Sequence, residues 1–399
     1  MSSSTQARAR RQLAWVLVLG LVALRVVTVV ASLTGTWPYS TPVSSDAGRY
    51  HQIASAPGTP YRDFKVEQAP VTLALIEVLN DHTNHGTRTR LMWSQLALDL
   101  VVAAAVAWGW GRRAGVAYLL LGVPFALYPF LYLRLDLLSV ALAVGAMALV
   151  RRRREVGGGA LLAVASLAKL WSLVLVPSFV VRKSWRSLTA FVVTFGAGLI
   201  AWVAWGGPGG PRQVLTYRGA RGWQIESSVG IVLHAVSDQR ARLEGGALRI
   251  GDVSTAAKLS LLGAGLVLVV MVWLLAARLR GDHDHLLDGI CPLAAISALL
   301  LTSTLFSPQY AVWLLPFAAI AAVTGDRLSA GLAGAVGALS VVDILLFNQL
   351  TQGEPVAIIV VITRNLLLLV LYCVVVRRLW KTAATRGGEP RSAVTLNSE

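Results

Sequence analysis

Long apolar runs, separated by short basic segments, recur along the whole chain. Between Leu13 and Val376 these runs reach about 20 residues, the length of helix that crosses a hydrocarbon core of roughly 30 Å. The expected spans are residues 12–33, 91–110, 115–132, 135–150, 187–205, 253–277, 286–306, 310–323, 328–349 and 355–376. The pattern predicts an all-α, polytopic integral membrane protein with about 10–12 transmembrane segments.

Residues 157–181 depart from this alternation. The four arginines Arg151–Arg154 precede the segment, and a second basic group begins at Arg182. Because basic residues gather on the cytoplasmic side, both ends of the segment belong on that side. The segment is too short for two full spans, so it predicts a hairpin of two short helices with Lys169 near the tip. A single span with one misleading basic flank is the alternative.

Composition agrees with membrane insertion. The chain is 55% hydrophobic and 14% charged, with a mean hydropathy of +0.63, whereas a soluble domain carries about 25% charged residues. Much of the formal net charge of +16 lies in short loops between apolar runs. That placement is typical of a topology signal, so we expect no nucleic-acid partner. Cys291 and Cys373 lie inside apolar runs and are interpreted as core residues rather than a disulfide or metal pair.

The basic residues also orient the chain. Arginines before the first apolar run place the N-terminus in the cytoplasm, and we expect that run to be retained as a span. Alternation from there puts two long loops, residues 34–90 and 206–252, on the extracytoplasmic side and the C-terminus in the cytoplasm. We expect one membrane domain over residues 1–381 and a disordered cytoplasmic tail over residues 382–399. Nearly all of the basic residues are arginine, and together with the abundant Ala, Val, Leu and Gly this composition indicates a GC-rich bacterial genome.

The first long loop carries acidic residues directly beyond the first span. Residues 46–70 read DAGRYHQIASAPGTPYRDFKVEQAP, and carboxylates at a lipid boundary are costly unless they are used. Asp46 is the first candidate for chemistry, and Asp63 and Glu67 are secondary candidates. The alternative roles are a helix cap at Asp46 and surface pairing of Asp63 and Glu67 with neighbouring cations.

Cations placed toward the same side of the membrane favour a phosphate ligand, because the planar arginine fork matches phosphate oxygens. Arg364 lies about mid-span, which favours an inward-facing role. The chain has no nucleotide-binding glycine fingerprint, P-loop, HExxH or GxSxG motif, and the HDH run at 283–285 is a weak metal signal. We therefore expect no cofactor or metal. The candidate cations are Arg134, Lys169, Arg218, Arg221 and Arg364.

Four segments together match a known pattern of membrane enzymes. They are the first-loop residues Asp46, Tyr50, Gly58, Pro60, Tyr61, Asp63 and Glu67 to Pro70, the Arg-x-Asp of Arg134 and Asp136, ALLAVASLAKLWSLVLVP, and FSPQYAVWLLP. With them the chain resembles the GT-C glycosyltransferases, and within these the bacterial family 87 type that includes polyprenyl-phosphate-mannose-dependent mannosyltransferases. Members often have Glu-Tyr-Pro-Pro where this chain has Glu-Gln-Ala-Pro, and often a histidine where it has Gln309 and Tyr310.

The resemblance implies a GT-C fold and an inverting enzyme of the bacterial inner (plasma) membrane. The enzyme would move a sugar, mannose foremost, from a polyprenyl-phosphate donor to a hydroxyl of a glycolipid or polysaccharide on the extracytoplasmic face. Asp46 would be the general base. The implied substrate-binding residues are Arg134, Asp136, Lys169, Arg218, Arg221, Arg364, Gln309 and Tyr310. Two other classes are a transporter or flippase for a lipid-linked sugar and a non-catalytic cell-envelope assembly partner; the two long outer loops argue against the transporter.

Overall fold

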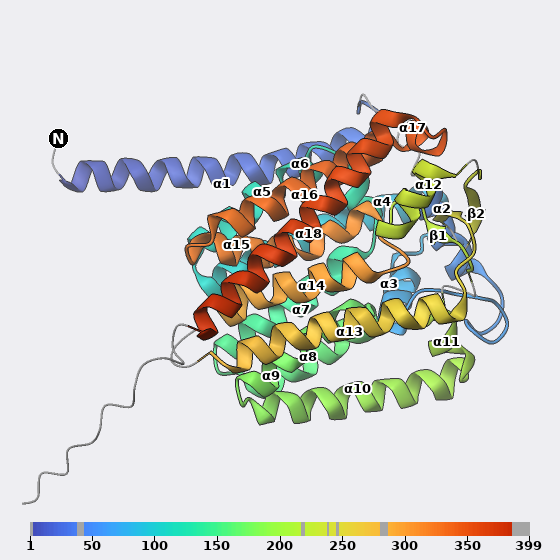
Figure 1. Cartoon of the computed structure of the whole chain (residues 1–399). Helices are drawn as coiled ribbons and strands as arrows, with labels where there is room; N and C mark the ends of the chain where they lie inside the picture. Colours follow the sequence, from blue (N-terminus) through green and yellow to red (C-terminus); the bar gives the residue numbers. More distant parts are fainter. Residues whose placement is uncertain are drawn as a thin grey trace, which may run out of the picture.

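The structure, a computed structural model, describes residues 3–37, 44–216, 220–237, 239–244, 247–279 and 286–384, with side chains from residue 12 onward except at 44 and 45. Helices form nearly all of its regular structure (Figure 1). Six helices of the described part are long and apolar enough to cross a membrane. They are α1 (Ser3–Leu33), α4 (Asn84–Trp110), α10 (Trp185–Gly206), α13 (Thr255–Ala277), α16 (Arg327–Leu345) and α18 (Pro355–Ala384).

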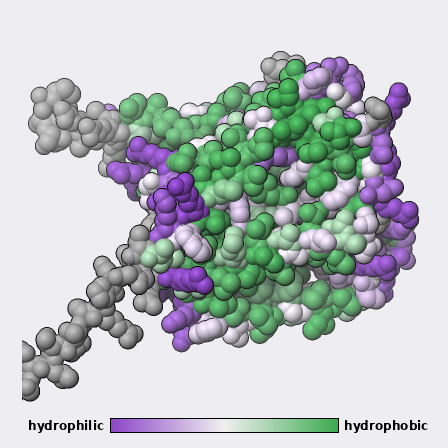
Figure 2. Space-filling model, viewed as in Figure 1, coloured by the Kyte–Doolittle hydropathy of each residue, from purple (hydrophilic) through white to green (hydrophobic). Residues whose placement is uncertain are grey.

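Apolar side chains cover the flanks of the bundle. On α13, Leu262, Leu266 and Val267 are 67%, 63% and 66% exposed. Figure 2 shows hydrophobic side chains along the middle of the molecule and hydrophilic ones gathered at its two ends. An apolar surface of this extent is unfavourable in water and suits contact with lipid. The predicted class, an all-α polytopic membrane protein, is confirmed.

Some expected spans are broken rather than continuous. The prediction of one helix over 115–132 is wrong, because the chain there forms α5 (Arg112–Leu121), α6 (Val123–Ala126) and the 3₁₀ turn η1 (Pro129–Leu133). Proline lacks an N–H and starts helices rather than continuing them, so Pro124 and Pro129 begin new segments. Two later expected spans, 286–306 and 310–323, also consist of two helical segments each. They are η4 (Leu286–Ile290) with α14 (Cys291–Thr302), and η5 (Pro308–Trp313) with α15 (Leu315–Val323).

The segment after the four arginines forms the predicted hairpin. Lys169 has extended backbone, with φ −160° and ψ 125°, and separates the two arms. Arg151 before the segment and Arg182 after it both bind Asp288, at 2.5 Å and 2.6 Å, so the two ends lie together. The elements of this region are α7 (Asp136–Arg151), α8 (Glu155–Ala168), η2 (Leu170–Leu175) and α9 (Pro177–Val181).

Both long loops lie at the same end of the bundle, together with α17 (Phe347–Thr351) (Figure 1). The first holds α2 (Ser44–Ser55) and α3 (Pro70–Leu79), and the second holds α11 (Gly209–Leu215), β1 (Trp223–Gln224), α12 (Ser228–Val236), β2 (Arg242–Glu244) and β3 (Ala247–Ile250). The strands form a small antiparallel sheet in the order β1-β3-β2, which the sequence did not predict. Helix α4 begins before the expected residue 91, because the Thr83 side chain caps it by accepting from the Gly86 N–H.

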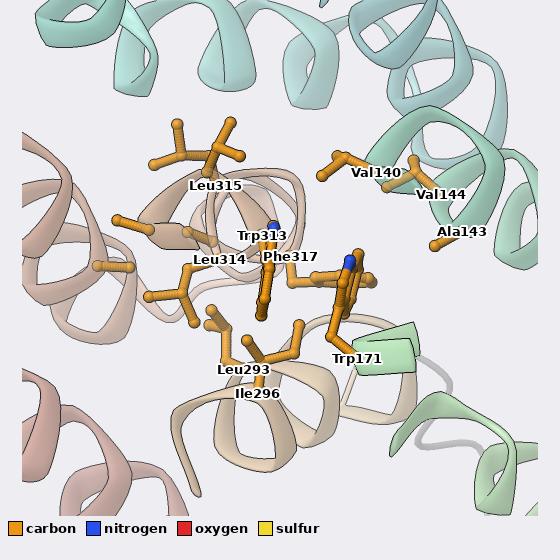
Figure 3. Close-up of a cluster of buried hydrophobic side chains, with 14 of the residues drawn as sticks. Val140, Ala143, Val144, Trp171, Leu293, Ile296, Trp313, Leu314, Leu315 and Phe317 are labelled. Carbon is orange, nitrogen blue, oxygen red and sulfur yellow. The ribbon is translucent and has the colours of Figure 1, made fainter. Parts of the chain in front are cut away.

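The hydrophobic core lies between the two polar ends. The indoles of Trp171 and Trp313 stack with centroids 5.1 Å apart and an interplanar angle of 10°. Figure 3 shows these rings among apolar side chains of α7 and α14, including Val144 and Ile296. Aromatic rings bury large apolar areas in fixed geometry, so this cluster rigidly supports the end of the bundle where the two long loops lie.

A buried ion pair ties the first span to the rest of the bundle. Arg25 Nε of α1 donates to Asp99 Oδ2 of α4 at 2.8 Å, and both side chains are almost completely buried. The hydroxyls of Tyr118 and Tyr132 donate to the same carboxylate at 2.6 Å and 3.1 Å. An unpaired charge at that depth is very unfavourable, so the network fixes how α1, α4 and α5 pack together.

Candidate functional site

A cavity of about 440 Å³ opens at the end of the bundle where the two long loops gather. Its walls come from α2, the start of α3, the junction of η1 and α7, the tip of the α8 hairpin, the turn after β1, and η5. The cavity brings together seven of the residues predicted from sequence. They are Asp46, Glu67, Arg134, Asp136, Lys169, Gln309 and Tyr310.

Asp46 lies in the first turn of α2 and forms an ion pair with Arg134. Arg134 sits in extended backbone between η1 and α7, and its guanidinium lies 4.5 Å from the centroid of the Phe130 ring. The Asp46 side chain is 16% exposed and the Arg134 side chain 22% exposed. The carboxylate is therefore held in place by the guanidinium and still reachable from the cavity.

A second ion pair joins Glu67 to Arg49 in the same cavity. Arg49 lies three residues after Asp46 on α2, and residues at that spacing share one face of a helix. Glu67 therefore pairs across the loop with α2 instead of with the cations nearest to it in sequence. The start of α3 is fixed to the hairpin tip, because the Thr72 hydroxyl donates to the Ala168 carbonyl at 2.7 Å.

Lys169 lines the cavity from the tip of the hairpin. Its Nζ lies 2.5 Å from Asp136 Oδ1, and the Trp313 indole N–H donates to the same oxygen at 2.9 Å. The ammonium also lies 4.3 Å from the centroid of the Tyr310 ring, a cation–π contact. Asp136 is buried at the start of α7, where the helix dipole stabilises a negative charge. The hairpin thus presents one ammonium group, which contacts the Asp136 carboxylate and the Tyr310 ring.

Gln309 and Tyr310 enter the cavity from η5, which begins at Pro308. The Ser307 hydroxyl donates to Gln309 Oε1 at 2.5 Å. The Tyr310 ring stacks on Trp313 with centroids 4.4 Å apart. The polar amide and the aromatic face stand beside Lys169, where the resemblance led us to expect a substrate contact.

Asp63 and Arg221 do not line this cavity. Asp63 is exposed, and its carboxylate accepts the Thr59 N–H at 2.5 Å, within its own loop. Arg221 is also exposed, and its backbone N–H donates to Glu244. Arg218 lies outside the described residues.

Arg364 is fully buried behind the cavity. Its Nη1 donates to Asp343 Oδ2 at 2.6 Å, and its Nη2 donates to the Glu226 backbone carbonyl at 2.6 Å. Its guanidinium also lies 4.2 Å from the centroid of the Phe306 ring. The Arg364 side chain points inward, as predicted, and the groups that it contacts belong to the protein itself.

The polar residues of the lining that sequence reasoning missed include Arg49, Gln224 and Glu226. Glu226 is 4% exposed, and the Gln224 amide donates to its carboxylate. Burial, with a further contribution from Asp343, raises the pKa of Glu226 to about 8. The only local signal is the capping serine that follows it, and a cap does not indicate a cavity residue.

This raised pKa predicts a pH-dependent stability that Glu226→Gln removes. Between pH 4.5 and 8 the unfolded carboxyl ionises while the folded one stays protonated, so wild-type stability falls as the pH rises through this window. Glutamine cannot ionise and lacks that loss. We expect the thermal unfolding midpoint of wild type to drop relative to Glu226→Gln as pH rises; parallel profiles would contradict the assignment.

The cavity combines groups for proton transfer and for anion binding. Arg49, Arg134 and Lys169 line it beside the carboxyls of Asp46, Glu67 and Asp136, together with Glu226, whose pKa is raised to about 8. The charges of the first six side chains cancel, so an anionic ligand must compete with a carboxylate for one of the cations. Such a site suits a ligand that carries both a phosphate and hydroxyl groups.

A family model described as glycosyltransferase family 87 matches residues 87–308, which is more than half of the chain. The matched stretch includes Arg134, Lys169 and Glu226, whereas Asp46 and Glu67 precede it. A search of curated proteins found no match.

Proposed function

The chain belongs to glycosyltransferase family 87 and is a membrane glycosyltransferase, and we propose that it takes its sugar from a polyprenyl-phosphate donor. The resemblance inferred from the sequence motifs is confirmed at the level of the family. The observation that carries the donor proposal is the Asp46–Arg134 ion pair inside a cavity with Lys169. One carboxylate and two cations there line the same cavity at the end of an apolar bundle, which suits a base acting beside a bound phosphate.

Asp46 is the proposed general base. An alcohol is a weak nucleophile, so a carboxylate must take the proton of the acceptor hydroxyl as its oxygen attacks the anomeric carbon. The new bond forms at that carbon while the bond to the donor phosphate oxygen breaks, and the phosphate leaves with the electron pair. Attack from the side opposite the phosphate inverts the centre, so a β-linked donor gives an α-glycoside.

Arg134 links donor binding to activation of the base. In the structure its guanidinium neutralises Asp46. A donor phosphate near Arg134 and Lys169 would compete for this guanidinium, because arginine binds phosphate oxygens at least as well as a carboxylate. As Arg134 turns to the phosphate, Asp46 loses its partner and becomes a stronger base. The neutral cavity thus becomes reactive only when the donor is bound.

The acceptor would enter on the side of Gln224 and Glu226. A buried carboxyl that stays protonated donates a hydrogen bond to a hydroxyl, and the Gln224 amide holds it in place. We propose a glycolipid or polysaccharide acceptor, with mannose as the transferred sugar. The reaction is proposed for the extracytoplasmic face of a bacterial cell membrane, with both termini in the cytoplasm, because the basic loops lie at the other end of the bundle.

The donor proposal is tested with purified full-length protein in proteoliposomes. We expect labelled mannose to pass from polyprenyl-phosphate mannose to an acceptor glycolipid, and none to pass from GDP-mannose. The product linkage, measured with an α-mannosidase, should be α. Direct transfer from the nucleotide sugar would overturn the proposal. Movement of the intact donor across the bilayer without transfer would instead favour the flippase alternative.

A further inference from the structure

A second cavity, of about 570 Å³, lies at the opposite end of the bundle from Asp46. Helix α7 connects the two sites: Asp136 at its start lines the first cavity, and Arg151 at its end lines the second. Its 16 residues span roughly 24 Å at 1.5 Å per residue, so the second cavity is separate from the proposed reaction. Four arginines line it, Arg151, Arg152, Arg153 and Arg182.

The back of this cavity is a rigid, charged frame. Asp288 is 1% exposed and binds Arg151 at 2.5 Å and Arg182 at 2.6 Å. The Trp110 indole N–H donates to the same carboxylate at 2.8 Å, and Arg151 Nε donates to the Gly109 carbonyl at 3.0 Å. Two guanidinium groups therefore share one carboxylate and keep fixed positions.

The front of the cavity carries positive charge without a counter-ion. Arg152 Nε donates to the Trp108 carbonyl at 3.1 Å, and among the described residues neither Arg152 nor Arg153 forms an ion pair. Arg153 also has a φ of 61°, a left-handed backbone that costs energy for a residue with a side chain. One carboxylate, Glu155, belongs to the lining. The arginines still exceed it in number, so the cavity favours an anion.

The surroundings of the cavity point to a lipid rather than a soluble anion. Val181, Ala276 and Leu287 supply apolar lining. Next to the cavity along the chain, Trp185 is 58% exposed and Leu274 is 59% exposed on the flank that faces lipid. A lipid whose head group occupies the cavity would place its acyl chains against this apolar flank. Basic pockets between membrane helices are typical sites for anionic head groups.

We propose that this arginine cavity binds the phosphate head group of an anionic membrane phospholipid. Arginine forks match phosphate oxygens, and the basic loops are expected on the leaflet that carries anionic lipid. The bound lipid would hold together the ends of α7, α9 and α13, which all contribute to the lining. This proposal does not depend on which donor the enzyme uses.

The test measures lipid binding directly. Purified full-length protein is titrated with phosphatidylglycerol in micelles that contain phosphatidylcholine, and bound lipid is counted by native mass spectrometry. The variant is Arg152→Gln with Arg153→Gln. The control is Arg112→Gln with Arg113→Gln, which removes the same charge from exposed positions at the start of α5. Unfolding midpoints measured in phosphatidylcholine alone verify that both variants fold.

We expect the Arg152/Arg153 variant to bind phosphatidylglycerol at least about tenfold more weakly, and the Arg112/Arg113 control to bind as wild type does. An equal loss in both variants would mean unspecific attraction of charge and would overturn the proposal, as would unchanged binding in the first variant. In the last experiment, inorganic phosphate is added to the lipid-bound protein. Displacement of phosphatidylglycerol by millimolar phosphate would show that the site binds a soluble anion instead of a lipid.

Discussion

Replacing Asp46 with Asn is expected to lower sugar transfer by about 10²- to 10⁴-fold, the range typical for loss of a positioned general base. Asparagine has nearly the same shape, so the fold is retained, but it cannot accept the proton of the acceptor hydroxyl. The loss should appear in kcat more than in the KM for the donor, because Arg134 and Lys169 remain available to its phosphate. Initial rates with polyprenyl-phosphate mannose in proteoliposomes measure both constants.

Asp63→Asn is the matched control. It makes the same chemical change in the same loop, at an exposed carboxylate whose hydrogen bond is to the backbone of Thr59. We expect it to change transfer less than about threefold, as is usual for a surface substitution. Full activity of Asp46→Asn would remove Asp46 from the role of base. If Glu67→Gln abolished transfer in that case, the base would be Glu67, which lines the same cavity.

Arg364→Met is expected to destabilise the protein by about 3–5 kcal/mol, because it leaves Asp343 buried without its cation. Arg364 is fully buried and Asp343 is 1% exposed, so water cannot replace the lost partner. The same change removes the 2.6 Å hydrogen bond from Arg364 to the Glu226 carbonyl and leaves only the one from the Asn365 amide, at 3.2 Å. The thermal unfolding midpoint of the purified full-length protein measures the effect, and activity should fall with stability.

The double variant Arg364→Met with Asp343→Leu separates structural from substrate roles. Removing both charges of a buried pair is far less costly than removing one, so the unfolding midpoint should recover much of the loss. If Arg364 instead bound the donor phosphate, as the sequence suggested, Arg364→Met would raise the KM for the donor at nearly unchanged stability. That result would contradict the role that its contacts assign to it.

Much of the membrane fold could be predicted from sequence, because the physical cause is local. A run of apolar residues partitions into lipid according to its own length and composition. The hairpin around Lys169 followed from the same argument combined with its basic flanks. The prolines at which the predicted span 115–132 breaks are also visible in the sequence, but an apolar run by itself does not show where its helix ends. The small sheet of the second loop was missed because its strands have two to four residues each.

The sequence by itself determined the membrane class and supplied the acids and cations from which a site could be built. It also predicted on which side of the membrane each long loop lies. Only the tertiary structure decided which of these acids and cations meet. The fold joins Asp46 of α2 to Arg134, which follows η1. It also brings Glu226 into the cavity and places Arg364 behind the cavity. The physical reason is the range of the forces: partition into lipid adds up along neighbouring residues, whereas an ion pair depends on atoms a few ångströms apart on segments that are distant in the chain.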